Sequence, residues 1–158
     1  MQLVDVLSPD RITVGISVSS KKSLLEKAAE LLAAAPGSAG SREIFDSLCQ
    51  RERLGSTGLG HGVAIPHGRV GGQENVAGAM IRLKHPIDFD APDHEKVDLF
   101  FALAVPERCT DTHLRLLAEM AERLGRDSQR EALRGTDDAD EVLRLLSDNP
   151  ADADAKAQ

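Results

Sequence analysis

The first apolar residues of the chain follow two different spacings, which predict a strand and then a helix. Between residues 11 and 19 every second residue is apolar, as in a half-buried strand. From Ser20 to Ala35 the apolar residues fall on one face of a helix, which Pro36 and Gly37 end. The apolar positions of these two elements are Ile12, Val14, Ile16 and Val18, then Leu24, Leu25, Ala28, Leu31 and Leu32.

The middle of the chain predicts a second helix and two more strands. The helix is expected over residues 41–53, and the strands over residues 76–83 and 97–105. The last strand is apolar at nearly every position, as expected of a central strand covered on both faces, and Pro106 ends it. The expected inner face of the helix comprises Ile44, Phe45, Leu48 and Cys49.

The last third of the chain predicts three helices. The first is expected to begin at a cap formed by Thr110 or Asp111 and to end at Gly125. Two shorter helices are expected over residues 128–133 and 138–147. The apolar positions assigned to the buried face of the first helix are Leu114, Leu117, Ala118, Ala121 and Leu124.

Strands interleaved with helices predict an α/β fold. We expect a single-domain sandwich over residues 1–147, with a central mixed β-sheet and helices on both faces. The chain of 158 residues is long enough for one core, which must be built from aliphatic residues and four Phe because Trp and Tyr are absent. Residues 148–158 are rich in Ala and Asp and can bury little, so a disordered acidic tail is expected.

Charge and cysteine content exclude several classes of partner. The net charge of −7 repels phosphate backbones and anionic membrane surfaces, so nucleic acid is not expected as a partner.

Cys49 and Cys109 stand in no ligand spacing and are expected to be reduced structural thiols. The N-terminus lacks a signal-like pattern, and no apolar run approaches about 20 residues. We therefore expect a cytoplasmic protein without membrane insertion.

The segment RERLGSTGLGHGVAIPHGR, residues 51–69, is the strongest indication of function. Seven of the thirteen glycines lie between Gly55 and Gly72, a density more typical of a functional loop than of packing. Near its end, His67 follows Pro66, whose φ is fixed. The segment therefore predicts a glycine-rich loop that holds one histidine at a stiff exit.

The segment does not match either of the common nucleotide-binding motifs. Gly55 and Gly60 have the spacing of a phosphate-binding loop, but His61 and Gly62 stand where lysine and Ser or Thr are required. The dinucleotide motif fails because Val63 replaces its third glycine. No nucleotide cofactor is therefore expected.

Two other kinds of chemistry are weaker alternatives. His61, His67 and His113 could converge on a metal, but no two of them have helical ligand spacing. Ser56 could be a hydrolytic nucleophile, but the G-x-S-x-G turn is missing. Neither a metal nor another cofactor is expected.

Phosphorylation of a histidine fits the segment best. It needs a neutral imidazole, donors for the phosphoryl oxygens and access for two partners. His67 is the predicted acceptor, and His113, in the first turn of its helix, is predicted to assist because a helix N-terminus favours an anion. The predicted donors are the hydroxyls of Ser56 and Thr57, the backbone N–H groups of the Gly58 to Gly62 run, including Gly60, and the guanidinium of Arg53 or Arg69.

At this point the sequence resembles a known family. The segment 51–69 is similar to the phosphorylation motif of the fructose and mannitol type IIA proteins of the bacterial phosphotransferase system, most closely their nitrogen-regulatory branch. Residues 86–93, 97–106 and 112–118 resemble later family segments in the same order, so the resemblance covers about residues 3–147. It implies His67 as phosphoryl acceptor, His113 as the residue that stabilises the phosphate, and Arg53 and Ser56 as motif positions.

The resemblance also implies partners. The donor would be a small histidine phosphocarrier protein, itself charged from phosphoenolpyruvate by an enzyme I. Because no IIB, IIC or phosphocarrier module is fused to the domain, we expect regulation of other proteins, such as a sensor kinase or potassium-transport components. The alternative is a free-standing sugar-specific IIA that passes the group to the IIB domain of a fructose- or mannitol-type permease. Leu59, Val63 and Ile65 are expected to form the apolar docking surface.

Overall fold

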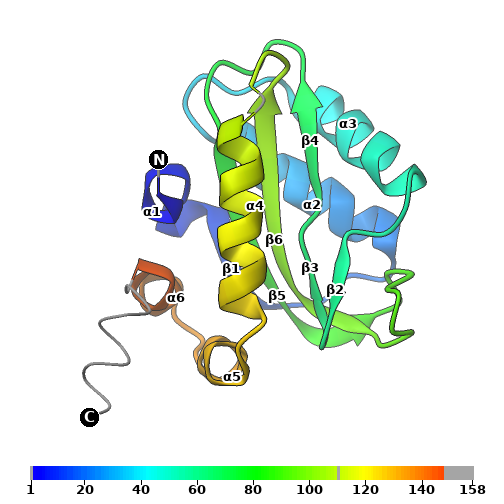
Figure 1. Cartoon of the computed structure of the whole chain (residues 1–158), viewed down its shortest axis with the longest axis vertical. Helices are drawn as coiled ribbons and strands as arrows, with labels where there is room; N and C mark the ends of the chain where they lie inside the picture. The colour runs from blue at the N-terminus through cyan, green and yellow to red at the C-terminus, as the bar shows by residue number, and fades with distance from the viewer. Residues whose placement is uncertain (1, 110, 148–158) are drawn as a thin grey trace.

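The computed structural model describes residues 2–109 and 111–147, which form a mixed six-stranded sheet with helices on both sides (Figure 1). In chain order the elements are α1 (Leu3–Val6), the 3-10 turn η1 (Pro9–Arg11), β1 (Ile12–Ile16), α2 (Lys21–Ala33), α3 (Ser41–Arg53), β2 (Gly58–Gly60), β3 (Val63–Ala64), β4 (His67–Val70), β5 (Ala77–Ile87), β6 (Val97–Pro106), α4 (Asp111–Leu124), α5 (Asp127–Arg134) and α6 (Ala139–Ser147). The predicted fold class is therefore confirmed. The predicted tail, residues 148–158, lies outside the described residues.

The sheet combines parallel and antiparallel pairs. Its strand order is β1-β5-β6-β3-β2, and β4 also pairs with β6. The pair β5 and β6 is antiparallel, as is β2 with β3, whereas β1 with β5 and both β3 and β4 with β6 are parallel. The long strand β6 is thus central, as its continuous apolar sequence predicts.

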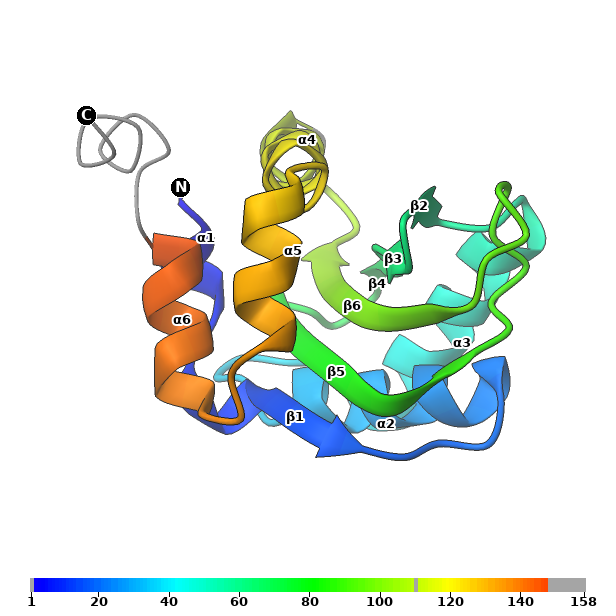
Figure 2. The ribbon, with the colours of Figure 1, turned by 90° about the horizontal axis from the view of Figure 1, so that it is seen from below.

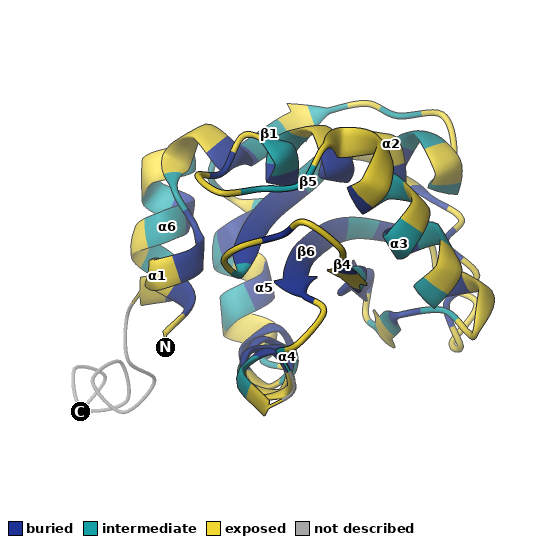
Figure 3. Cartoon of the chain, turned by 90° about the horizontal axis from the view of Figure 1, so that it is seen from above, coloured by how far each residue is buried: buried dark blue, intermediate teal, exposed yellow. Residues whose placement is uncertain are grey.

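Helices cover both faces of this sheet. One core lies between the sheet and α2 and α3, and a second core lies between the sheet and α1, α4, α5 and α6 (Figure 2). Alternate residues of β6 enter the two cores: Phe100 and Ala102 face α2 and α3, while Phe101 and Leu103 face α4. Except at Asp98, β6 is buried along its whole length (Figure 3).

The short strands β3 and β4 behave as one strand interrupted at a proline. Val63 pairs with Leu99 and His67 pairs with Leu103, so the register against β6 is the same before and after the interruption. Pro66 has no N–H to donate, but its carbonyl still accepts from the Leu103 N–H at 3.1 Å. The pairing with β6 therefore fixes where His67 begins its strand.

The prediction that residues 51–69 form one glycine-rich loop is wrong. The segment folds instead into β2, β3 and β4 with turns between them. Gly60 and Gly62 take φ values of 93° and 80°, which glycine adopts at little cost. His61 between them has a φ of 58°, which is uncommon for a residue with a side chain. The glycines therefore allow a tight reversal from β2 into β3 rather than a long open loop.

The helix α4 buries a different face from the predicted one. Leu114 and Ala118 are exposed and Ala121 is only half-buried. Leu117 and Leu124 fit both the predicted and the observed face, so the apolar spacing alone admitted two rotations of the helix. The observed buried residues of α4 are His113, Leu116, Leu117, Met120, Arg123 and Leu124.

Most other predicted elements match within a few residues. The helix α3 has the predicted bounds, although Phe45 and Cys49 are half-buried rather than buried. The strand β5 continues beyond its predicted end to Ile87, with irregular pairing after Arg82. The helix α1 was not predicted, and its Leu3 and Val6 are buried against the second core; the predicted cap residue Thr110 lies outside the described residues.

Candidate functional site

The imidazole of His67 is held by the backbone beside it. Its Nδ1 lies 2.8 Å from the carbonyl oxygen of Ile65. A carbonyl oxygen only accepts hydrogen bonds, so Nδ1 carries the proton in the neutral ring and donates it to Ile65. The free lone pair is then on Nε2. One defined nitrogen, Nε2, therefore keeps a lone pair that is free to react.

A cavity of about 360 Å³ opens beside His67. Its walls come from α3, from β4 with the end of β6, and from the first turn of α4, which are neighbours in Figure 1. The α3 side chains in this wall recur at the spacing of one helical face. The lining residues are Ser47, Gln50, Arg51, Leu54, His67, Gly68, Arg69, Val105 and His113.

The surroundings of His67 favour its neutral form. Burial lowers the pKa of His67 most, while the hydrogen bond to Ile65 and the carboxylate of Glu52 oppose that change. The positive charge of Arg51 and the neighbouring His113 lower the pKa further. The net direction is downward from the ordinary histidine value, so the neutral imidazole dominates at neutral pH.

His113 faces the same cavity from the third residue of α4. Its side chain is only 6% exposed, and Nδ1 is buried without a hydrogen-bond partner among the described residues. Burial lowers the pKa of His113 most, the charge of Arg69 lowers it further, and Asp111 opposes both. The observed rotation of α4 thus places a second imidazole, whose pKa is also lowered, in the lining of the cavity beside His67.

The arginine of the last turn of α3 that lines the cavity is Arg51. It is half-buried, and its Nη1 donates to the Gly55 carbonyl at 2.8 Å, across the end of the helix. Arg53 is exposed and lies two residues further, about 200° around the helix, outside the described lining. Sequence reasoning missed Arg51. The signal that could have found it is its helical phase, which it shares with Ser47 and Leu54.

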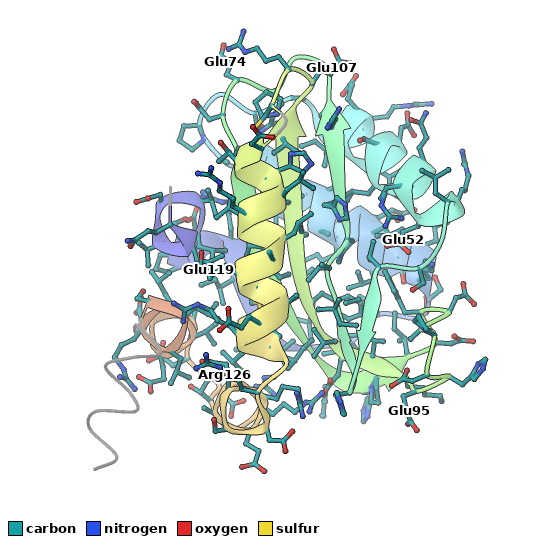
Figure 4. The ribbon with its side chains drawn as sticks, in the orientation of Figure 1. Glu52, Glu74, Glu95, Glu107, Glu119 and Arg126 are labelled. Carbon is teal, nitrogen blue, oxygen red and sulfur yellow. The ribbon has the colours of Figure 1, made fainter. Side chains whose placement is uncertain are left out.

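The two hydroxyls predicted to bind phosphate are engaged elsewhere. Thr57 is buried, and its Oγ1 donates to the carboxylate of Glu52, to which its N–H also donates at 3.3 Å. Glu52, labelled in Figure 4, pairs in addition with Lys21 at 3.0 Å. Ser56 Oγ donates to the Phe89 carbonyl at 2.9 Å. A buried carboxylate needs such partners, so these bonds stabilise the fold of the segment.

The predicted backbone nest at Gly58 and Gly60 is also not beside His67. Both glycines belong to β2, which pairs with β3, and neither is in the described lining of the cavity. At Gly58 a Cβ would lie 2.9 Å from the Cβ of Ala91, so this glycine permits a close packing contact. His61 is exposed and lines a different cavity together with Asp93.

The predicted apolar docking surface needs correction. Val63 and Ile65 are 1% and 8% exposed and belong to the core, because both point toward α4 from the interrupted strand. Leu59 remains accessible. The large apolar side chains exposed near the cavity are instead Leu54, which is 85% exposed at the end of α3, and Leu114, which follows His113.

Metal and membrane sites were also considered within residues 2–109 and 111–147. No group of three or more His, Cys, Asp or Glu residues is placed there to hold a metal ion. In the same part of the chain, no helix combines the length and the apolar character needed to cross a bilayer. Cys49 and Cys109 are both free thiols.

Comparisons with known proteins agree on one family. The family described as "Phosphoenolpyruvate-dependent sugar phosphotransferase system, EIIA 2" matches residues 5–149. The nitrogen regulatory protein of Pseudomonas aeruginosa is 40% identical over 148 residues, which are 94% of this chain and 96% of that protein. The crystal structure of nitrogen regulatory protein IIA-Ntr from Neisseria meningitidis has a TM-score of 0.87 at 43% identity and covers 92% of this chain and 99% of its own. The crystal structure of IIA mannitol from Escherichia coli shares the fold, with a TM-score of 0.76 at 23% identity, covering 89% and 99% of the two chains.

The chain therefore belongs to the EIIA type 2 family of the phosphoenolpyruvate-dependent phosphotransferase system. Proteins of this family receive a phosphoryl group from upstream components and pass it on to a IIB domain or to regulatory targets, and the role of this chain is that of a phosphocarrier. The resemblance read from residues 51–69 is confirmed at the level of the family.

Proposed function

We propose that His67 is the phosphoryl acceptor of this phosphocarrier and that Nε2 is the atom that accepts the group. The observation that carries the proposal is the hydrogen bond from Nδ1 to Ile65, which leaves Nε2 as the nucleophile beside a cationic cavity. The Nε2 lone pair attacks the phosphorus of a phosphohistidine on the donor protein. The donor's P–N bond breaks, and its electron pair returns to the donor's ring nitrogen.

Two arginines support the transfer electrostatically. Arg51 and Arg69 line the cavity from α3 and β4, and their positive charges act on His67 and His113, respectively. Phosphoryl transfer gains most from fixed positive charge around the oxygens, and a planar guanidinium can offer two donors to them. We assign both arginines to charge stabilisation.

His113 is assigned to donate one hydrogen bond to the phosphoryl group. Its Nδ1 is buried without a described partner, and a buried N–H without an acceptor would cost roughly 1–3 kcal/mol. The neutral ring is therefore best protonated on Nε2, which leaves that N–H to donate toward an occupant of the cavity. His67 and His113 would thus carry their protons on opposite nitrogens and act as acceptor and assistant.

The remaining predicted site residues support the site indirectly in this proposal. Ser56 and Thr57 hold the segment through Phe89 and Glu52, and Gly58 and Gly60 shape β2. Arg53 ends α3, where a positive charge complements the helix dipole. None of these residues is assigned a contact with the phosphoryl group.

We infer that the donor is a small histidine phosphocarrier protein and that phosphorylation regulates other proteins, in the domain formed by residues 1–147. The similarity of 40% and 43% to nitrogen regulatory proteins supports a regulatory role over sugar transport, since the identity to IIA mannitol is 23%. Sensor kinases and potassium-transport components are proposed targets.

The test is to incubate the chain with phosphoenolpyruvate, enzyme I and a phosphocarrier protein, and to follow its intact mass. One acid-labile, alkali-stable phosphoryl group is expected, and heteronuclear NMR of the imidazole should place it on Nε2 of His67. A group found on Nδ1 or on another residue would contradict the proposal. Rapid onward transfer to the IIB domain of a mannitol- or fructose-type permease would favour the sugar-specific alternative.

A further inference from the structure

The helix α3 and the strand β4 touch at Gly68. A Cβ at Gly68 would overlap with Ser47 Oγ and lie 3.1 Å from the backbone carbonyl carbon of Ser47, so a side chain there would push the helix away. The hydroxyl of Ser47 donates to the carbonyl of the next strand residue, Arg69, at 2.6 Å. One serine thus ties the helix to the strand where the two backbones meet.

This contact lies between the groups assigned to phosphoryl transfer. Ser47 and Arg51 are one turn apart on the same face of α3. His67 and Arg69 flank Gly68 on β4. The relative placement of Arg51 and His67 is therefore set across the contact of Ser47 with Gly68.

The strand needs such a tie because it lies at the edge of the sheet. In the described part of the chain β4 is hydrogen-bonded to one strand, β6, so its other side is held by α3. The hydroxyl of Ser47 is used in this tie, because it donates its proton to a backbone carbonyl of β4. Its removal would free the edge strand to shift against the helix.

Building on the proposed function, we propose that Ser47 is a positioning residue for phosphoryl transfer, whose bond to the Arg69 carbonyl over Gly68 holds Arg51 at the correct distance from His67. Small displacements matter in such a step, because a misplacement of about 1 Å can cost up to about a hundredfold in rate. Ser47 acts through Arg51 and makes no contact with the phosphoryl group.

Ser47→Ala and Ser38→Ala form a matched pair of variants. Ser38 is also a partly buried serine whose hydroxyl donates to backbone carbonyls, those of Ala33 and Ala39, but it lies between α2 and α3 and not in the cavity lining. Each variant loses one hydroxyl that donates to the backbone, so Ser38→Ala should lose at least as much stability as Ser47→Ala. We expect the rate of phosphoryl acceptance by Ser47→Ala to fall about tenfold, in kcat rather than in KM for the phosphocarrier, and that of Ser38→Ala to stay at the wild-type level.

A second readout does not depend on phosphorylation. The groups that face His67 are Arg51 and Glu52 of α3, Arg69 of its own strand and His113 of α4. If Arg51 moves away in Ser47→Ala, the pKa of His67 should rise toward its ordinary value in an NMR titration of the unphosphorylated protein. Ser38→Ala should leave that titration unchanged.

The double variant separates positioning through Arg51 from a general loss of stability. When Arg51→Gln is already present, adding Ser47→Ala should change neither the rate of phosphoryl acceptance nor the pKa of His67 much further. The guanidinium that Ser47 positions is then already gone. Equal effects of Ser47→Ala with and without Arg51, or a match to Ser38→Ala in both readouts, would overturn the proposal. A wild-type chain that is not phosphorylated on His67 would instead overturn the proposed function, while the titration would still report how Ser47 places Arg51.

Discussion

The glycine-rich segment has two halves that differ in what their polar groups already bind. In the first half, residues 53–62, both hydroxyls are bonded to Glu52 or Phe89, and the glycines form β2 and its turn. In the second half, residues 63–69, the interrupted strand delivers His67 and Arg69 to a cavity. Judged from the sequence alone, both halves carry groups that could bind a phosphoryl group. Their difference shows that a polar group can serve a ligand only when the fold has not already satisfied it.

Loss of the acceptor is the strongest test of this division. We expect His67→Ala to reduce phosphoryl acceptance by at least about a thousandfold, since the other imidazole of the described lining, His113, is assigned to donate a hydrogen bond rather than to attack. Intact-mass analysis after incubation with the donor proteins measures it. His61→Ala is the matched control from the first half and should be labelled at the wild-type rate. Labelling lost in His61→Ala but kept in His67→Ala would reverse the roles of the halves.

The two arginines at the end of α3 give the next largest contrast. Arg51→Gln should slow phosphoryl acceptance about a hundredfold, because one charge that stabilises the transferring group is removed. Arg53→Gln should change the rate by less than about threefold, since its side chain lies outside the described cavity lining. Quenched-flow assays with a radiolabelled phosphoryl donor measure the rate of phosphoryl acceptance for both variants. If Arg53→Gln were the slower variant, the first half of the segment would have to contact the phosphoryl group after all.

Thr57→Val should affect stability rather than transfer. The change keeps the shape of the side chain but leaves the buried carboxylate of Glu52 without one donor, at a cost of about 1–3 kcal/mol in the free energy of unfolding. Urea denaturation measures this cost, and the transfer rate should stay within about threefold of wild type. A large loss of rate at unchanged stability would show that Thr57 belongs to the site.

The smallest expected effect is on how stability depends on pH. Burial lowers the pKa of both His67 and His113 in the folded state, so the unfolded chain binds more protons as the pH falls below the ordinary histidine value of about 6.5. Stability contributed by the neutral rings is present above that value and is lost as the pH falls toward the lowered folded pKa values. His113→Gln should therefore flatten the decline in the free energy of unfolding on acidification, and an unchanged slope would contradict the assignment.

Much of the fold could be predicted because it depends on local periodicity. The bounds of α3 and the burial of β6 follow from the spacing and density of apolar residues. The rotation of α4 could not be predicted in the same way. Leu117 and Leu124 belong to two overlapping apolar faces, and contact with the sheet selects the one that buries His113 and exposes Leu114.

The candidate site was predictable only in part for a related reason. His67 and His113 stand out by residue type and position, whereas Arg51 differs from Arg53 only in helical phase. The engagement of Thr57 depends on Glu52 being buried, which a charged residue near a helix end does not suggest. Ser47 is separated from its partner strand by the whole of β2 and β3, so nothing in the local sequence indicates their contact.

The shared register of β3 and β4 sets a limit on how this chain can change in length. Side chains alternate between the two faces of a strand, so deletion or insertion of one residue between Ala64 and His67 would turn the imidazole from the α4 side to the α3 side. The turn at Gly71 and Gly72, after the last paired residue of β4, carries no such constraint. Length variation among functional variants of this domain should therefore be absent between Ala64 and His67 and tolerated a few residues after His67.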